Sequence, residues 1–343
     1  MASSPRFKKS KNHPGGLSAV NILKTIARVL VLSLLFIAPA GAQTYPDKPV
    51  RIIVPYAAGG ITDILARALA QQLTERWGQQ VIVENRPGGN SQIGAEYVAR
   101  SAPDGYTLLV SADTTFVMAP HLYRDQKFDA LEDFAPITGL GISPQALVIH
   151  PSVPVNSVAE LIAYGRDHPG ALNYGTFGIG SSGHLNIELI QMMTGAHFTP
   201  VHYGGATPAI NDLLGGHIQF MIVSVGLVAQ PWKAGLLKVL AIGSKQRLKQ
   251  FPDTPTLAES GLKDFEAGSW YGLVAPKGTP PDIIAKINRD TVAAFSDPAF
   301  QQKMLAPSFT YSIASSPQDF AAMMRRESDK WKKVIDASNI KLD

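Results

Sequence analysis

The sequence predicts an α/β protein of two lobes, each built on a mixed, mostly parallel sheet flanked by helices. Strand-like runs alternate with helix-like runs along most of the chain, a pattern typical of parallel sheets covered by helices. Two Gly-rich loops, at residues 55–60 and 177–183, each lie between a strand-like run and a helix-like run. Without a 42-residue leader the chain keeps 301 residues, more than the ~100–200 of one typical core, so two domains are expected.

The first 42 residues have the pattern of a secretory signal peptide. A basic leader precedes the apolar run at residues 29–38, and Ala40-Gly41-Ala42 forms an A-x-A cleavage signal. We expect cleavage after Ala42 and export to the periplasm of a Gram-negative bacterium. The alternative is an N-terminal membrane anchor, but the apolar run is shorter than the ~20 residues that span a bilayer.

The charge of the chain changes once this leader is set aside. Six of the 31 basic residues lie in residues 1–42, which hold no acidic residue, so the remainder carries 25 basic and 27 acidic residues, a net charge of −2. This argues against a nucleic-acid partner. There are no cysteines, the histidines lack metal-ligand spacing, and no apolar run after residue 42 is long enough to span a membrane. The sequence therefore predicts a soluble monomer without disulfides, metal or cofactor.

The first lobe is predicted as a β-α-β-α-β unit. Strands are expected where β-branched residues cluster, and helices where apolar residues recur at helical spacing. Pro136, Gly139, Gly141 and Pro144 are expected to interrupt regular structure before a new strand at residues 146–149. The expected elements before this point are strands at 50–54, 81–83 and 107–110, a helix from 61 to about 73, and a helix at 93–99.

The alternation restarts after residue 157 and predicts the second lobe. Lobe 1 is expected at residues 43–143 and 267–343, lobe 2 at 144–266, with the C-terminal segment returning to lobe 1. The alternative is a separate C-terminal helical tail.

The expected elements from residue 157 onward belong to both lobes. They are strands near 172–174, 197–203, 220–223 and 236–242, and helices at 157–166, 185–193, 207–214, 283–295 and 318–338.

The two Gly-rich loops predict a site for a small anion. A strand that turns tightly into a helix leaves the first N–H groups of the helix free, and the helix dipole favours an anion there. Small residues let a ligand approach the backbone closely. Neither loop contains Lys or Arg, so the anion would be held mainly by backbone donors.

Other anion-binding and catalytic patterns are not supported. Residues 178–183 match G-x-G-x-x-G, but no Asp or Glu occurs between Glu188 and Asp212, where dinucleotide binding requires an acidic residue. No G-K-[ST] follows either loop, and H-E-x-x-H, G-x-S-x-G and a cysteine nucleophile are absent from the sequence.

Several polar side chains near the loops have both a structural and a ligand-binding interpretation. Asp63 either caps the first turn of its helix and orients the loop, or accepts a bond from a ligand. His184 is either a structural hydrogen bonder or a ligand contact. Thr114 and Thr115 follow the third strand, at the sheet edge where α/β proteins bind ligands. Tyr203 with Gly204 could form another backbone cradle or a simple turn, and we expect Trp270 and Tyr271 to pack between the lobes.

The chain resembles the periplasmic solute-binding proteins of tripartite tricarboxylate transporters, the Bug family. The matching motifs keep their order and spacing through nearly the whole chain after the leader. They are Tyr45-Pro46, Lys48-Pro49-Val50-Arg51, Val54-Pro55-Tyr56-Ala57-Ala58-Gly59-Gly60 with Asp63, Glu84-Asn85-Arg86-Pro87-Gly88, Ala102-Pro103-Asp104-Gly105-Tyr106, the stretch 173–188, Tyr203-Gly204-Gly205, Pro252-Asp253 and Ala275-Pro276.

The resemblance implies a type II periplasmic-binding-protein architecture with a mono- or dicarboxylate in an interlobe cleft, held through backbone groups and bridging water. It also implies two membrane transporter subunits as partners. The loop motifs and the resemblance together predict one set of ligand-binding residues. Its members are Tyr56, Ala57, Ala58, Gly59, Gly60, Asp63, Thr114, Thr115, Gly178, Ser181, Ser182, His184, Tyr203 and Gly204.

Two departures from the family pattern lie near the expected cleft. Gly88-Gly89-Asn90-Ser91-Gln92 stands where family members read G-A-G-G, and Val223-Ser224 stands where many carry an Asp. Both bear on the identity of the ligand. The leading hypothesis is a receptor without chemistry of its own; a sensing subunit for a membrane signalling protein and an exported enzyme acting on a small acid are the alternatives.

Overall fold

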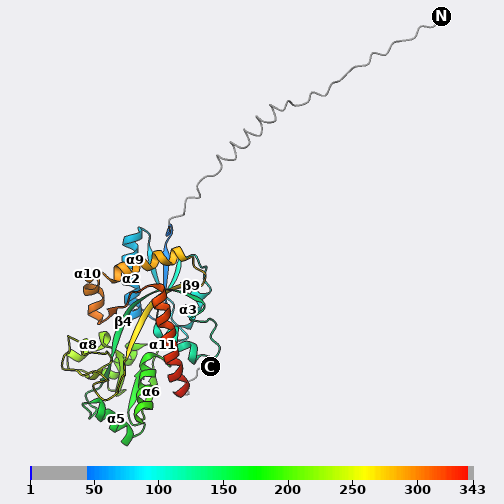
Figure 1. Cartoon of the computed structure of the whole chain (residues 1–343). Coiled ribbons are helices and arrows are strands. Elements are labelled where there is room, and N and C mark those ends of the chain that lie inside the picture. Colours follow the sequence, from blue (N-terminus) through cyan, green and yellow to red (C-terminus); the bar gives the residue numbers. More distant parts are fainter. Residues whose placement is uncertain (2–44, 339–343) are drawn as a thin grey trace. The chain divides into compact units, whose positions relative to one another are not determined.

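The computed structural model describes Met1 and residues 45–338. The predicted signal peptide and its cleavage after Ala42 lie outside the described residues. Contacts divide the chain after Asp47, and all elements below belong to the unit that begins at Lys48. Figure 1 shows this unit as a sheet with helices on both of its faces.

The described strands form one continuous mixed sheet in the order β2-β1-β3-β9-β4-β7-β5-β6, with β8 and β10 also paired to β4. They are β1 (Val50–Val54), β2 (Val81–Asn85), β3 (Thr107–Ala112), β4 (Phe134–Ile149), β5 (Asn173–Thr176), β6 (Thr199–His202), β7 (Phe220–Ser224), β8 (Lys238–Ile242), β9 (Gly268–Pro276) and β10 (Tyr311–Ser312).

The helical elements follow the predicted ones with three additions: the short segment η1–α4 after β3, helix α8, and the short segment α10–η2–η3 after α9. They are α2 (Ile61–Trp77), α3 (Gln92–Ala99), the π-helical turn η1 (Thr114–Met118), α4 (Ala119–Leu122), α5 (Val158–Asp167), α6 (Ser182–Thr194), α7 (Ala206–Leu214), α8 (Val225–Lys233), α9 (Pro281–Phe295), α10 (Pro298–Phe300), η2 (Gln301–Leu305), η3 (Ala306–Ser308) and α11 (Pro317–Ser338).

Strand β4 corrects the prediction that Pro136, Gly139, Gly141 and Pro144 interrupt regular structure. All four lie inside one strand of 16 residues. The strand absorbs them because its register against β9 shifts between Pro136 and Thr138 and again between Gly139 and Gly141. The residues left without a β9 partner are Ile137 and Leu140. Pro136, Gly139 and Gly141 thus flank these irregularities, and Pro144 lies at the end of the pairing with β9.

Strand β4 also divides the sheet into two halves. Its residues 134–144 pair with β9, whereas its residues 145–149 pair with β7 and β8. We call β1, β2, β3, β9 and β10 the first half and β5, β6, β7 and β8 the second half. The pairs among β1, β2 and β3 and among β5, β6 and β7 are parallel, as predicted, while β4, β9 and β10 add more antiparallel pairing than the β-α-β pattern suggests.

The strand directions make the two halves point at each other. Strand β3 is antiparallel to β9 and β9 is antiparallel to β4, so β1, β2 and β3 run in the direction of β4, toward the second half. Strand β7 is antiparallel to β4, so β5, β6 and β7 run toward the first half. The carboxyl ends of both parallel sets therefore face the junction that β4 crosses.

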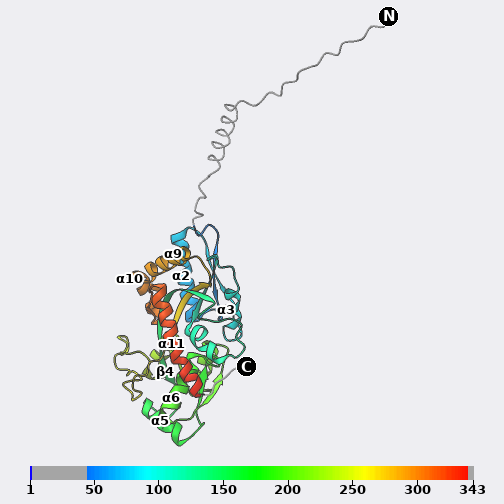
Figure 2. The ribbon, with the colours of Figure 1, turned by 45° about the vertical axis from the view of Figure 1, so that its right-hand side comes forward.

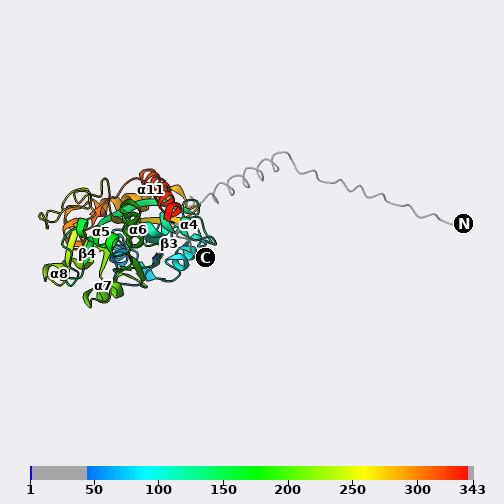
Figure 3. The same ribbon diagram turned by 90° about the horizontal axis from the view of Figure 1, so that it is seen from below.

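Alternation along the strands places helices on both faces of the second half. In β4, Leu147 and Ile149 belong to one core cluster with α5 and α6, whereas Ala146 and Val148 belong to another with α7 and α8. Successive side chains of a strand point to opposite faces, so the two clusters lie on opposite sides of the sheet. Figure 3 shows α5 and α6 separated from α7 and α8 by the strands.

Helix α11 packs onto the body, which argues against the separate C-terminal tail. Its buried residues Phe320, Met324 and Trp331 share a core cluster with Trp270 of β9 and Leu185 of α6. Figures 1 and 2 show the helix running along both halves. Strand β10 joins the first half by pairing with β4. The lobe boundaries at residues 143/144 and 266/267 stay predictions.

Candidate ligand-binding site

The first Gly-rich loop, residues 55–60, joins the carboxyl end of β1 to helix α2. Ala57, Ala58 and Gly59 are exposed, and the N-cap residue Gly60 has no side chain with which to cap the helix. A Cβ atom added at Gly59 or Gly60 would meet nothing within 4 Å, and Gly59 has a φ of +91°. Open space therefore adjoins the loop at the point where an anion was predicted.

Asp63 holds this loop in shape. One of its oxygens, Oδ2, accepts from the Gly59 N–H at 3.1 Å, Arg67 donates to both oxygens, and Asn85 donates to Oδ1 at 3.0 Å. Burial raises the pKa of Asp63, but the hydrogen bonds from Arg67, Gly59 and Asn85 outweigh it and leave the pKa below its ordinary value. These partners favour the interpretation in which Asp63 orients the loop.

The second Gly-rich loop, residues 177–183, joins β5 to α6 and is held by His184. The Gly180 N–H donates to His184 Nδ1 at 2.9 Å, and Ser181 caps the helix by accepting from the His184 N–H at 3.4 Å. Burial, with the neighbouring His202, lowers the pKa of His184 to about 4. The imidazole is therefore neutral near pH 7 and acts as an acceptor that shapes the loop.

A cluster of hydroxyl groups connects the first loop to η1. Thr115 Oγ1 lies 2.8 Å from Tyr56 Oη, 2.6 Å from Ser111 Oγ and 2.8 Å from Ser91 Oγ. A hydroxyl has one proton and two lone pairs, so these partners occupy Thr115 fully. Thr115 thus positions Tyr56, whose phenol pKa is raised by burial. Thr114 is buried beside it.

Ser182 belongs to a second buried network that the sequence did not reveal. Gln145 Nε2 donates to Ser182 Oγ at 2.7 Å and to Ser269 Oγ at 3.1 Å, and the two serine hydroxyls lie 2.7 Å apart. Asn186 donates to Gln145 Oε1 at 3.0 Å. Because Gln145 is in β4 and Ser269 in β9, this network ties the second loop to the strand that crosses the junction and to its neighbour in the first half. A polar residue before the apolar run 146–149 was the available signal.

Tyr203 and Gly204 follow β6 at the same edge of the second half. Tyr203 Oη donates to Asp212 Oδ2 at 2.7 Å, and burial together with this carboxylate raises the pKa of Tyr203 to about 12. A Cβ atom at Gly204 would meet nothing within 4 Å. The segment therefore adds an open backbone stretch beside the second loop.

Asp113 is a buried carboxyl group that follows β3 and contacts β9. It is 2% exposed and accepts from the Thr114 N–H at 2.8 Å and from the Trp270 N–H at 3.4 Å. Burial raises its pKa to about 7 despite these bonds. Trp270 itself stacks on Phe116 at 5.9 Å, as expected for a packing residue.

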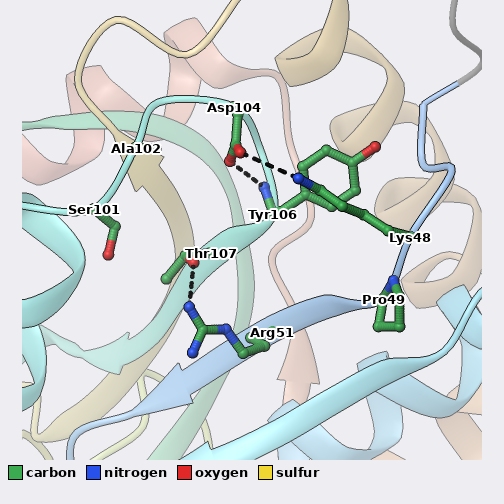
Figure 4. A pocket seen from close by; sticks show the side chains of 8 residues that line it. All are labelled: Lys48, Pro49, Arg51, Ser101, Ala102, Asp104, Tyr106 and Thr107. Carbon is green, nitrogen blue, oxygen red and sulfur yellow. Dashed lines mark hydrogen bonds and ion pairs between the residues drawn. The ribbon is translucent and has the colours of Figure 1, made fainter.

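A pocket of about 310 Å³ lies away from these loops, at the amino ends of β1 and β3 (Figure 4). Its cations are already engaged: Lys48 Nζ is 3.7 Å from Asp104, and Arg51 donates to Thr107 at 3.2 Å. The amino ends of parallel strands are opposite to their carboxyl ends, so this pocket is distinct from the loop junction. Open space beside Gly59, Gly60 and Gly204 favours the junction as the anion site.

Among residues 45–338, no helix is long and apolar enough to cross a membrane. In that same part of the chain, no three His, Asp or Glu side chains are grouped to hold a metal ion.

The fold and the facing loops are those of a two-lobed solute-binding protein, and comparisons agree. Residues 65–340 match the model of the tripartite tricarboxylate transporter family receptor. Protein BugT of Bordetella pertussis is 37% identical over 324 residues, covering 92% of this chain and 99% of BugT. The chain belongs to this family of periplasmic receptors, the Bug family, which confirms the resemblance inferred from its motifs.

Solved structures show the same architecture. An R. palustris protein with adipate has a TM-score of 0.82 and 34% identity, and the match covers 87% of this chain and 99% of that protein. MatC from Rhodopseudomonas palustris with bound malate has a TM-score of 0.78 and 28% identity, with 85% and 100% covered. The periplasmic binding protein BugD has a TM-score of 0.79 and 32% identity, with 87% and 99% covered.

Proposed function

We propose that this protein is a periplasmic receptor that binds a small organic carboxylate between residues 55–60 and 177–183. The observation that carries the proposal is that two Gly-rich loops without Lys or Arg face each other across the junction. Backbone N–H groups at helix N-termini are sufficient donors for a carboxylate. Relatives solved with adipate and malate, both dicarboxylates, support a mono- or dicarboxylate ligand.

Of the residues nominated from the sequence, Asp63, Thr115 and His184 would act by shaping the loops. The main donors to the ligand would be the backbone N–H groups of Ala58 and Ser182, because those of Gly59 and Ser181 already donate to Asp63 and to Gly178. The charge of −2 after residue 42 offers no long-range attraction for an anion. Recognition would therefore depend on short hydrogen bonds, which strengthen when the two lobes close and exclude water.

Delivery to the membrane subunits of a tripartite transporter completes the proposed function. The chain would act in the periplasm as a monomer, after cleavage of the leader at Ala42. Its lobes, residues 43–143 with 267–343 and residues 144–266, would move about β4 and β9.

A thermal-shift screen over small mono- and dicarboxylates tests this function, followed by calorimetry and by analysis of the acid for turnover. A receptor is stabilised by its ligand, which is recovered unchanged. Stabilisation with conversion of the acid would indicate an exported enzyme instead. Loss of uptake in a deletion strain would support transport, whereas normal uptake with a lost response to the acid would indicate sensing.

A further inference from the structure

Asn90 is a side chain of the first half that bonds directly to the second Gly-rich loop. Its Nδ2 donates to the carbonyl oxygen of Ile179 at 2.9 Å. Asn90 lies in the loop after β2, and Ile179 lies in the loop after β5. The bond therefore bridges the junction at which the carboxyl ends of both parallel sets meet.

The backbone around Asn90 is shaped for this contact. Asn90 and Ser91 both have left-handed backbone angles, with φ of 49° and 78°. Asn adopts this region more readily than most residues, because its short polar side chain forms local hydrogen bonds. Ser91 is 1% exposed and accepts from Thr115, which also holds Tyr56. A chain of bonds thus links the first Gly-rich loop to the segment that carries Asn90.

The second Gly-rich loop is in turn shaped to receive this side chain. A Cβ atom at Gly178 would lie 3.2 Å from Asn90 Oδ1, and one at Gly180 would lie 2.1 Å from Leu122 Cδ1. Both glycines have a positive φ, of +134° and +72°. At these positions glycine permits contact between the two halves, whereas at Gly59 it adjoins open space.

We propose that Asn90 is a latch, a positioning residue whose bond to Ile179 forms when the lobes close and slows the release of the bound acid. The inference rests on the proposed function, since it assumes that the loops enclose a carboxylate. A bond made only after closure stabilises the closed state and leaves the first encounter with the ligand unchanged. Asn90 thus acts on ligand release through Ile179.

Two variants separate the side chain from the backbone. Asn90→Gly keeps the left-handed conformation and removes the donor, and Asn90→Asp keeps the shape but turns an oxygen toward the Ile179 carbonyl. Asp264→Gly is the matched control, because Asp264 is exposed and has a φ of 58°. The chain has no cysteines, so spin labels at Ala159→Cys and Ala285→Cys, both exposed, report the distance between the halves.

Without ligand, we expect Asn90→Gly to shift the label distances toward the open form by about fivefold in population, the factor of one uncharged hydrogen bond. Asn90→Asp should shift them further, and Asp264→Gly should match the wild type. With adipate or malate as the probe, stopped-flow binding should show dissociation about fivefold faster in Asn90→Gly, with association unchanged.

The proposal that Asn90 is a latch would be overturned if both Asn90 variants had the label distances and the dissociation rates of the wild type. If neither acid binds the wild type, the proposed function fails for these acids, and the label distances of the ligand-free protein alone decide the latch. A slower association rate with unchanged dissociation would also contradict it, because it would place Asn90 in the first encounter.

Discussion

At the scale of single residues, the titratable groups around the loops support the backbone more than they face a ligand. Asp63 is bound to Gly59 and Arg67, His184 holds the Gly180 N–H, and Asp113 lies buried against β9. Open space beside Gly59 and Gly204 is where the proposed anion would lie. The pKa of His184 is lowered and that of Asp113 is raised, so these two buried groups make the unfolding free energy depend on pH in opposite directions.

Replacing His184 with Asn should remove part of the loss of stability in acid. The pKa of His184 is about 4 when folded, against 6.5 ordinarily, so its stabilising contribution is present above pH 6.5 and lost as pH falls toward 4. The wild type should lose about 3 kcal/mol of unfolding free energy from this group across that window. Asn retains an acceptor for the Gly180 N–H.

Urea unfolding at several pH values measures the effect, with the exposed His217→Asn as the control. A His184→Asn variant with the same pH slope as the wild type would show that His184 does not titrate in this way.

Replacing Asp113 with Asn should act in the opposite direction. The pKa of Asp113 is raised from 3.8 to about 7, so the folded protein binds a proton more tightly than the unfolded chain, and stability falls as pH rises through this window. Asp113→Asn should flatten this dependence and increase the unfolding free energy above pH 7, by up to about 4 kcal/mol less the cost of losing one of the two acceptors. A variant less stable than the wild type at pH 8 would contradict the prediction.

At the scale of elements, each Gly-rich loop is anchored by a different helix and strand set. Helix α2 supplies Asp63 to the first loop, and α6 supplies His184 to the second. The hydroxyl cluster of Thr115 and the amide of Gln145 then tie these loops to η1 and to β4. Helix α11, from the other end of the chain, shares a core cluster with η1, β9 and α6.

The docking of α11 depends on Phe320. Its ring packs edge-on against Trp270 at 5.7 Å, and a Cβ atom at Gly272 would lie 2.1 Å from its Cζ. Phe320→Ala should therefore leave a cavity over β9 and lower the unfolding free energy by about 3–5 kcal/mol. The exposed Arg326→Ala is the matched control in urea unfolding. A loss below about 1 kcal/mol would indicate that α11 is not docked there.

At the scale of the whole molecule, the glycines of the two Gly-rich loops have different surroundings, although the loop sequences look alike. Gly59 adjoins open space at the first loop, while Gly178 lies against Asn90 of the opposite half. Under the proposed function, the first glycine would leave room for the ligand and the second would permit closure of the lobes.

Valine at each position should distinguish these tasks by calorimetry and by the spin-label distances. Gly59→Val should abolish carboxylate binding because its side chain fills the open space beside the first loop. The spin-label distances of the ligand-free protein should not change. Gly178→Val should weaken binding and also shift the ligand-free protein toward the open form. Gly78→Val is the control, because Gly78 has a φ of +66° and open surroundings but lies at the end of α2. Carboxylate binding as strong as in the wild type in both loop variants would refute the proposal that the two loops hold the carboxylate.

Local pattern was enough to predict most elements and the position of both loops. The spacing of apolar residues and the Gly and Pro residues that end helices and strands are local features. They were enough to predict the strands and helices around residues 50–77 and 173–194. Helix α8 was missed because Pro231 lies within it, and β4 because its prolines and glycines are accommodated only by its pairing with β9. That pairing joins residues more than a hundred positions apart.

The sequence by itself determined the α/β class, the positions of the two Gly-rich loops and the family, since each depends on short motifs and their order. Only the tertiary structure decided that β4 runs from one half into the other and so turns both sets of carboxyl ends to one junction. It also decided which residues meet there: Asn90 with Ile179, and Gln145 with Ser182. The physical reason is that these contacts depend on strand direction and packing, which no local pattern contains.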